Sequence, residues 1–513
     1  MIFSSSSEKK GVNKMRRLMM TMTLFTILFT LTHLISSSFY QISASRVWLP
    51  SRAEIATGTD LEAISTTLLA IPTFLGNNYR NFYGIGPVPS KLKVIWKVYL
   101  GSGKTWVKGG FKVWSGCGWT GQPLIVEENG RPYILIGAYD HCLRKIDGLS
   151  GKVIWKYKFD DVIKGTGTVY RGKEDFIILQ GSRRGNSCTL ASKIVPSFRA
   201  ISYSSGKELW RMNIPRTESY SRDVDGSALV LGRIAYLGAE NGIFYIIDIS
   251  GNYPKILKQI KLYNKRDIVR HGHNLVIESS PALCGNKIIV TAGSGHVFGI
   301  DKDSWEIVWD FYIGSDLDGS PVVTREGYIL VSVEKQHIRG QGGVFMLDPR
   351  KKPSEAVKWY SPVKNRRFAD WEGGVIGSPA INDSYNDGKK PALTAFSAID
   401  GTLYVVLRNE LSKEKARGPN LEGPYPMPKK VFRFNIGGSI STPIFCGDEE
   451  RDWLIAAGYN GVYLFRIDYE GGIKFTLMDH FASGVSFEAT PVVWKGRIYI
   501  GSRNGWFYCL GDK

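Results

Sequence analysis

The 513-residue sequence has few cysteines and few histidines, and their arrangement limits the chemistry that the chain can carry. It contains six cysteines and seven histidines. No two cysteines are adjacent, no Cys-x-x-Cys pair occurs, and the wide spacing resembles no dense disulfide scaffold. GxSxG, HExxH, phosphate-loop and dinucleotide-binding motifs are also missing from contexts that would support them. The sequence therefore contains no recognisable catalytic motif.

Long helical patterns are also lacking. Beyond residue 75, no stretch keeps a 3.6-residue periodicity for long. Glycine and aromatic residues are abundant instead, with 57 Gly, 25 Tyr, 24 Phe and 14 Trp. This composition favours many turns and many strands. We therefore expect an all-β protein.

Only one long hydrophobic run occurs, and it lies near the N-terminus. Residues 18–35 (LMMTMTLFTILFTLTHLI) follow five Lys or Arg residues. Their length falls between the apolar part of a signal peptide and a comfortable membrane span. We predict that residues 1–45 are a signal peptide or a signal anchor and that the rest of the chain is exported, either secreted or membrane-anchored. Met15 is an alternative start. No cysteine closely follows the run, which argues against a bacterial lipoprotein anchor.

An internal repeat determines the predicted fold. Eight segments share an opening small residue, an apolar strand, a turn, a second strand and a third strand. The copy ESSPALCGNKIIVTAGSGHVFGIDKDSWEIVWDFYIG adds a fourth strand that carries a tryptophan. The segments open at residues 121, 166, 225, 278, 318, 377, 441 and 488. This spacing of 40 to 64 residues is typical of one four-stranded propeller blade per repeat.

The last repeat lacks its tryptophan strand, and a matching strand lies upstream of the first repeat. Residues 93–100 (KVIWKVYL) closely match KVIWKYKF at 152–159. Pairing residues 93–100 with residues 505–510 would remove the exposed edges of a ring of blades. We therefore predict an eight-bladed β-propeller over residues 91–513, closed by the N-terminal strand, with residues 46–90 as a linker and lead-in.

The repeat resembles that of the quinoprotein-like, PQQ-type β-propellers. The shared pattern runs SSP, strand, G, DG, strand, D-x-x-x-G-x-x-x-W, and the likeness covers residues 74–513. Eight blades and a membrane-targeting start also resemble the BamB-like outer-membrane assembly factors. Quinoprotein dehydrogenases hold PQQ against two adjacent cysteines, with Ca²⁺ and an aspartate base, and this chain has no such pair. The resemblance therefore implies the fold and argues against PQQ as a cofactor.

Four acidic residues form the first candidate site. Asp225, Glu278, Asp318 and Glu488 each stand two positions before the opening Ser or Thr of a repeat. Because the innermost strands of a propeller begin at one rim of its channel, we expect these carboxylates to gather there. Gathered carboxylates favour a cation, and oxygen ligands suit Ca²⁺ better than Zn²⁺. The alternative is that each carboxylate accepts hydrogen bonds from a neighbouring turn.

Two histidines and two tryptophans form weaker candidates. His271 and His273, in RHGHN, precede Glu278 and suggest a metal site, but a His-x-His pair needs a third ligand. Trp114 and Trp119, in FKVWSGCGWTGQP, lie among glycines at the start of the first repeat. They either stack on a sugar or peptide or plug the channel.

These features predict a non-catalytic binding scaffold at the cell envelope or surface. The formal net charge of +19 is dispersed, which suits an anionic surface and not nucleic acid. The expected partner is an envelope or cell-surface protein or an anionic polysaccharide, with membrane attachment through the N-terminus and a monomeric chain. The insertions at 183–197, 335–342 and 409–429 are candidate contact loops. The alternative is a metal-dependent or quinone-dependent oxidoreductase-like enzyme that uses the acidic rim.

Overall fold

The computed structural model describes residues 67–119, 121–447, 451–482 and 484–512. The predicted signal peptide or anchor, residues 1–45, lies outside these ranges. Within them, no helix has the length and apolar character that crossing a membrane would require.

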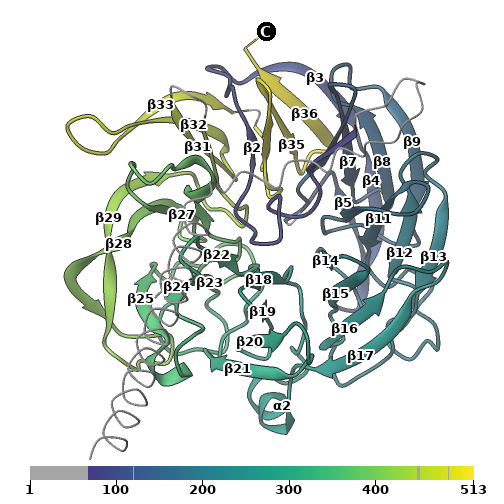
Figure 1. The fold of residues 1–513 in the computed structure, drawn as a ribbon, viewed down its shortest axis with the longest axis horizontal. Helices are drawn as coiled ribbons and strands as arrows, with labels where there is room; N and C mark the ends of the chain where they lie inside the picture. The colour runs from purple at the N-terminus through teal and green to yellow at the C-terminus, as the bar shows by residue number, and fades with distance from the viewer. Residues whose placement is uncertain (1–66, 120, 448–450, 483, 513) are drawn as a thin grey trace, which may run out of the picture. The chain divides into compact units, whose positions relative to one another are not determined.

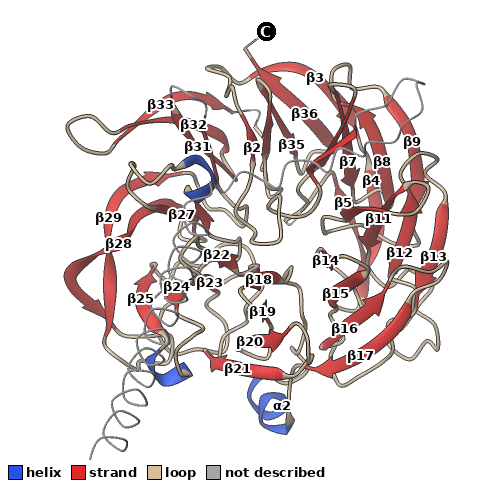
Figure 2. Ribbon diagram, viewed as in Figure 1, coloured by secondary structure: helices blue, strands red, loops and turns tan. Residues whose placement is uncertain are grey.

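Eight antiparallel sheets surround a central channel, one for each predicted repeat (Figure 1, Figure 2). This arrangement confirms the prediction of an all-β, eight-bladed propeller. Each blade has four principal strands, which follow one another from the channel outwards. The strands of blades 1 to 4 are β6 (Leu124–Glu128), β7 (Arg131–Gly137), β8 (Cys142–Asp147) and β9 (Val153–Lys158); β10 (Thr168–Arg171), β11 (Phe176–Gly181), β12 (Phe198–Ser202) and β13 (Glu208–Met212); β14 (Leu229–Leu231), β15 (Ile234–Gly238), β16 (Ile243–Asp248) and β17 (Lys255–Lys261); and β18 (Ala282–Cys284), β19 (Lys287–Thr291), β20 (His296–Asp301) and β21 (Ile307–Tyr312).

The second half of the ring repeats the same order. The strands of blades 5 to 8 are β22 (Val322–Val323), β23 (Ile329–Val333), β24 (Gly343–Leu347) and β25 (Val357–Pro362); β26 (Ala380–Ile381), β27 (Leu393–Ser397), β28 (Thr402–Ala416) and β29 (Tyr425–Asn435); β30 (Ile444–Gly447), β31 (Asp452–Gly458), β32 (Gly461–Asp468) and β33 (Lys474–Phe481); and β34 (Val492–Trp494), β35 (Arg497–Gly501), β36 (Trp506–Gly511) and β3 (Lys93–Tyr99). The described helices are α2 (Lys265–His271), η1 (Pro353–Glu355) and η2 (Asp383–Tyr385).

Strand burial follows the position of each strand in its blade. The third strand β8 is buried at every residue, because both of its faces pack against neighbouring blades. The outermost strand β9 alternates between exposed and half-buried residues. A strand buried on both faces reads as a continuous apolar run, and a strand with one solvated face reads as an alternating one. The repeat could be recognised in the sequence because it combines both patterns.

The tryptophans of the outermost strands pack between adjacent blades. The indole N–H of Trp155 donates to the carbonyl of Tyr203 in the next blade at 2.9 Å, and Trp309 donates to Lys351 at 2.9 Å. A Cβ on Gly206, whose φ is +68°, would lie 2.6 Å from the Trp155 ring. Glycine at this turn therefore permits both the positive φ and the close packing of the indole.

The eighth blade contains strands from both ends of the described chain. β3 pairs antiparallel with β36, in a register that places Lys93 opposite Gly511 and Tyr99 opposite Trp506. The Trp96 indole donates to Gly148 in blade 1 at 3.1 Å, as the other wedge tryptophans do across their own blade contacts. The strand expected at residues 93–100 thus lies where the last repeat lacked one.

A chain of hydroxyl groups links neighbouring blades around the channel. The backbone N–H of Ser280 donates to the Ser320 hydroxyl at 2.8 Å, and that of Ser320 donates to the Ser378 hydroxyl at 2.9 Å. Equivalent bonds join Ser227 to Ser280 and Ser378 to Thr442, both at 2.9 Å. In blades 4 to 7, the small hydroxyl residue that opens the repeat therefore connects its blade to the preceding one.

Residues 67–85, which we call the channel segment, run along the inside of the ring (Figure 1, purple). β1 (Thr67–Ile71) pairs antiparallel with β6 of blade 1, and β2 (Gly84–Ile85) pairs parallel with β34 of blade 8. Between them, carbonyls of the channel segment accept hydrogen bonds from the first strands of other blades. These bonds, all 2.7–3.2 Å long, are Val169 to Pro72, Leu283 to Asn78, Val323 to Tyr79 and Val493 to Tyr83. The sequence analysis had treated these residues as a lead-in outside the propeller.

Candidate functional site at the mouth of the channel

The first strands of the blades all begin at one end of the channel, which we call the mouth. Seven described residues occupy the position two before the opening hydroxyl residue, and they are not all acidic. In blades 2 to 8 they are Lys164, Asp225, Glu278, Asp318, Ile376, Ile440 and Glu488. The mouth is therefore charged along blades 2 to 5 and at blade 8, and apolar at blades 6 and 7.

Lys164 fills a cluster of three carboxylates. Carboxylate oxygens of Asp225, Glu240 and Glu278 lie within 4.8 Å of one another. The Lys164 ammonium forms ion pairs with Asp225 and, at 3.1 Å, with Glu240. We call these four residues the blade-3 cluster. The Lys164 ammonium group is therefore the cation beside Asp225 and Glu278, where the sequence predicts a bound Ca²⁺.

The protonation of this cluster reflects its burial. Burial raises the pKa of Asp225 to about 6, against the opposing effect of Lys164. Burial likewise raises the pKa of Glu240 and of Glu278 to about 8. Burial alone would lower the pKa of Lys164, but the surrounding carboxylates hold it well above its usual value. Lys164 is therefore a permanent cation, and part of the carboxylate set is protonated near neutral pH.

A second cluster of three carboxylates lies at blade 5. Oxygens of Asp316, Asp318 and Glu334 lie within 4.8 Å of one another, and we call these residues the blade-5 cluster. No Lys or Arg in the described ranges forms an ion pair with any of them. Burial and the charge of Asp316 raise the pKa of Asp318 and of Glu334 well above the ordinary carboxyl range.

Glu488 stands apart from both clusters. It accepts hydrogen bonds from the Tyr459 hydroxyl and from Arg503, each at 3.1 Å. The four predicted acidic residues therefore do not meet at one point. Asp225 and Glu278 share the blade-3 cluster, Asp318 belongs to the blade-5 cluster, and Glu488 pairs with its own arginine.

The two candidate histidines point to different neighbours. His271 is buried at the end of α2, with its ring 4.8 Å from that of His337. His273 is exposed, and its Nδ1 lies 2.6 Å from the carbonyl oxygen of Glu218. Neither residue belongs to the groups of three potential metal ligands found among the described residues.

The two candidate tryptophans also have different surroundings. Trp119 packs against buried Ile376 and Ile440, together with Phe368 and Trp371 of a loop between blades 5 and 6. Trp119 thus covers the apolar part of the mouth. This position agrees with the alternative in which the tryptophan plugs the channel. Trp114 lies against the Tyr139 ring at 5.2 Å.

A hairpin outside the eight blades rises beside the mouth. β4 (Ser102–Val107) and β5 (Gly110–Ser115) pair only with each other, in the connection between blade 8 and blade 1. Arg183 of blade 2 donates to the Thr105 hydroxyl at 2.8 Å and to the Trp106 carbonyl at 2.9 Å. At the tip, the Lys108 ammonium lies 3.8 Å from the carboxylate of Asp370, in the loop that also holds Phe368 and Trp371.

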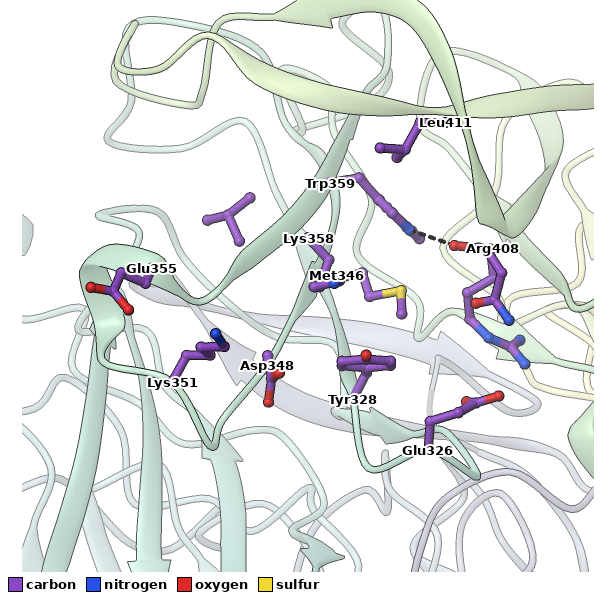
Figure 3. A pocket seen from close by; sticks show the side chains of 12 residues that line it. Glu326, Tyr328, Met346, Asp348, Lys351, Glu355, Lys358, Trp359, Arg408 and Leu411 are labelled. Carbon is purple, nitrogen blue, oxygen red and sulfur yellow. Dashed lines mark hydrogen bonds between the residues drawn. The ribbon is translucent and has the colours of Figure 1, made fainter.

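The opposite face of the ring holds a separate pocket of about 520 Å³ between blades 5 and 6 (Figure 3). Glu326, Asp348 and Lys351, from the outer turns of blade 5, line one side of it. The Trp359 indole donates to the Arg408 carbonyl across the pocket wall at 2.9 Å. Charges of both signs line this pocket, and its best-ordered polar contact joins two blades. We therefore regard it as a groove between blades.

Comparison with known proteins identifies the architecture. No protein-family model matches the chain, and no curated protein matches it in sequence. Solved structures do match. BamB from Moraxella catarrhalis aligns with a TM-score of 0.50 and 13% identity over 82% of this chain and 100% of its own. The chain therefore shares its eight-bladed propeller fold with this structure.

Two dehydrogenases share this propeller fold. Quinohemoprotein alcohol dehydrogenase from Comamonas testosteroni aligns with a TM-score of 0.54 and 15% identity over 86% of this chain and 80% of its own. A europium-containing methanol dehydrogenase aligns with a TM-score of 0.52 and 12% identity over 84% and 90%. At these identities the matches show the propeller fold alone, and function must be argued from the site.

Sequence reasoning missed Lys164, Glu240, Asp316 and Glu334. The sequence did contain a signal for Asp316 and one for Lys164. Asp316 belongs to the motif DxDGS, which residues 223–227 and residues 316–320 share. Lys164 stands at the same position of its repeat as Asp225 does. Glu240 and Glu334 follow second strands, and only the folded blade brings them to the mouth.

Proposed function

We propose that the chain is an exported, non-catalytic propeller that binds a protein or an anionic polysaccharide at the cell envelope or surface, with the mouth as its binding face. The observation that carries this proposal is the β4–β5 hairpin, which belongs to no blade. Its Trp106, Phe111 and Val113 are 38%, 55% and 61% exposed. Contiguous exposed apolar side chains on a soluble domain mark an interaction surface.

The charge of the hairpin supports an anionic contact. Lys104, Lys108 and Lys112 are exposed, and residues 102–115 contain no Asp or Glu. The Trp106 and Phe111 rings pack edge-to-face at 5.0 Å, which holds them as a firm platform. Aromatic platforms flanked by cations suit an acidic protein surface or an acidic sugar chain.

The channel segment favours the mouth over the opposite face. Its backbone bonds lie three residues beyond the hydroxyl positions of blades 2, 4, 5 and 8. The channel segment therefore lies further along the first strands than the carboxylates of the mouth do. Loops that project from a rigid scaffold are the usual location of binding residues.

Replacing Trp106 and Phe111 together by alanine should weaken partner binding about tenfold or more, since buried aromatic anchors dominate interface energies. The full chain is first used to capture proteins and glycans from envelope extracts, and captured molecules are identified by mass spectrometry. The affinity of the purified partner is then measured for the wild type and the double variant.

Tyr253→Ala is the matched control for that experiment. Tyr253 is 76% exposed in a turn on the opposite face of the ring. The control should bind the partner as the wild type does, and both variants should unfold at the wild-type temperature. Unchanged affinity in the double variant would contradict the proposal for the hairpin.

An oxidoreductase-like enzyme is the second candidate, and the carboxylate clusters are the observation that favours it. The residues present do not fit PQQ, because no adjacent cysteine pair exists. Oxygen-rich clusters do suit Ca²⁺. Since Lys164 already occupies the blade-3 cluster, the blade-5 cluster is the remaining cation site in the described part of the mouth.

This second candidate predicts that Ca²⁺ raises the melting temperature of the full chain. At a concentration a hundredfold above its Kd, a ligand stabilises the folded state by about 2.7 kcal/mol. Replacing Glu278 by Gln and Asp318 by Asn together should abolish the rise. Differential scanning calorimetry with Ca²⁺, and with Mg²⁺ at equal ionic strength, measures it. A flat response to Ca²⁺ removes this candidate's metal site.

A further inference from the structure

The motif DxDGS occurs twice, at the beginning of blade 3 and at the beginning of blade 5, and the aspartates of the two copies differ in their ion pairs. In blade 3, both aspartates are paired with cations from blade 2. Lys164 forms an ion pair with Asp225, and Arg183 Nε donates to Asp223 at 2.6 Å. The backbone N–H of Arg184 also donates to Asp223 at 2.9 Å. The chain thus supplies two positive charges for two carboxylates at this motif.

Blade 4 supplies no such cations to the motif of blade 5. Lys164 stands two residues before the hydroxyl position of its blade, and Glu278 stands at that position in blade 4. Arg183 stands two residues after Gly181, which ends β11, and Gly293 stands two residues after Thr291, which ends β19. A lysine and an arginine are therefore replaced by a glutamate and a glycine.

The second motif also holds a buried acceptor without a donor. Asp316 is 6% exposed, and its Oδ2 accepts a hydrogen bond from Asn274 Nδ2 at 2.6 Å. Its Oδ1 has no hydrogen-bond partner among the described residues, and neither has Oδ1 of Asn274. An unpaired buried carboxylate oxygen costs free energy unless a donor or a cation reaches it. Asp318 is half-buried and is the most exposed of the three, since Asp316 and Glu334 are each 6% exposed.

We propose that the blade-5 cluster is a receptor for a primary ammonium group, presented by a lysine side chain of a protein that docks on the mouth. The inference rests on the proposed scaffold function and specifies its partner. Lys164 shows how this chain binds an ammonium group, since the blade-3 cluster also brings three carboxylates together at the mouth. The partner's lysine repeats this arrangement two blades further along the ring.

The donor geometry favours ammonium over a metal ion. An ammonium group has three N–H donors and needs one acceptor for each, which three carboxylates provide. Ca²⁺ takes six to eight oxygens, and Asp316 Oδ2 is already engaged by Asn274. A guanidinium group requires two parallel acceptors in one plane, whereas these oxygens come from three separate side chains. The hairpin beside the mouth would contact the partner's surface around the inserted lysine.

Titration of the full chain with Nα-acetyl-lysine amide tests the proposal. The probe should raise the melting temperature, and the Nε-acetylated analogue, which lacks the charge, should not. Asp318→Asn should weaken probe binding about tenfold or more, as expected for loss of a charge-assisted hydrogen bond. Glu488→Gln removes a mouth carboxylate that Arg503 already satisfies, so this control should bind the probe like the wild type.

A variant with an internal lysine supplies a second test that leaves all three blade-5 carboxylates in place. Glu278→Lys places an ammonium group at the position that Lys164 holds two blades earlier. It should abolish the response to the probe. Wild-type probe binding in this variant would overturn the proposal.

The remaining outcomes separate this inference from the scaffold function. A stabilising response to Ca²⁺ with none to the probe, or no response to either, would overturn the ammonium site. A captured protein that binds Asp318→Asn and the wild type equally would overturn the inserted lysine and leave the scaffold intact. A probe response without any captured partner would support the ammonium site and contradict the scaffold function.

Discussion

Replacing Arg80 by methionine should lower the free energy of unfolding by about 3 kcal/mol or more, because several buried acceptors lose their donor together. Arg80 lies in the channel segment and is fully buried. Its guanidinium donates to the carbonyls of Phe74 at 2.8 Å and Pro281 at 2.9 Å, and to the Thr73 hydroxyl at 2.7 Å. Burial lowers the pKa of Arg80 to about 9.

Chemical denaturation of the full chain measures this loss. Methionine keeps much of the side-chain volume, so the effect reports the hydrogen bonds and not a large cavity. Arg233→Met is the control, because the Arg233 side chain is 72% exposed. That substitution should change the free energy of unfolding by less than about 0.5 kcal/mol. Equal stability of the two variants would show that the channel segment does not hold the blades together.

Deleting residues 91–100 should destabilise the propeller by more than about 5 kcal/mol, which is comparable with the whole stability of many domains. The deletion removes β3 and leaves β36 as an unpaired edge in blade 8. It also removes Trp96, whose ring packs 5.9 Å from Tyr499 and 6.0 Å from Phe507. Unpaired strand edges also promote aggregation.

A deletion of similar length in the next segment is the control. Replacing residues 104–113 by a Gly-Gly turn removes most of the β4–β5 hairpin, which pairs with no blade. This variant should keep a cooperative unfolding transition close to that of the wild type. Circular dichroism melts of both deletions, run side by side, test the role of β3. A cooperative wild-type melt of the chain that lacks residues 91–100 would contradict it.

The blades could be predicted because each repeat carries its own pattern. Strands such as β19 and β20 are buried on both faces, and the outer β21 alternates around Trp309. These periodicities can be recognised within a single repeat. Because eight repeats have the same order of strands, they predict a propeller of eight blades. The tryptophan of residues 93–100 made the missing strand recognisable for the same reason.

The channel segment could not be predicted in this way. β1 and β2 are short, and the residues between them bind mainly through backbone carbonyls, which no side-chain pattern records. Arg80 reads as an ordinary surface cation in the sequence. Only the closed ring places its guanidinium among buried carbonyls.

The carboxylates could be predicted only in part. Their position at one rim follows from the repeat, but their grouping depends on cations contributed by neighbouring blades. Lys164 and Arg503 divide the predicted set, and Asp316 and Glu334 complete a cluster around Asp318. The sequence gives the order of the charged residues along the chain. Which carboxylate pairs with which cation depends on the blades that become neighbours in the ring.

Cross-linking of the full chain to its purified partner is the most direct measurement of the central claim, that the mouth is the binding face. Lysine-reactive cross-links, mapped by mass spectrometry, should come from Lys104, Lys108 and Lys112 of the hairpin. The turns of the opposite face carry Lys173 and Lys302 as internal comparators. We expect partner cross-links from the hairpin lysines and none from Lys173 and Lys302. Cross-links confined to Lys173 and Lys302 would contradict the claim.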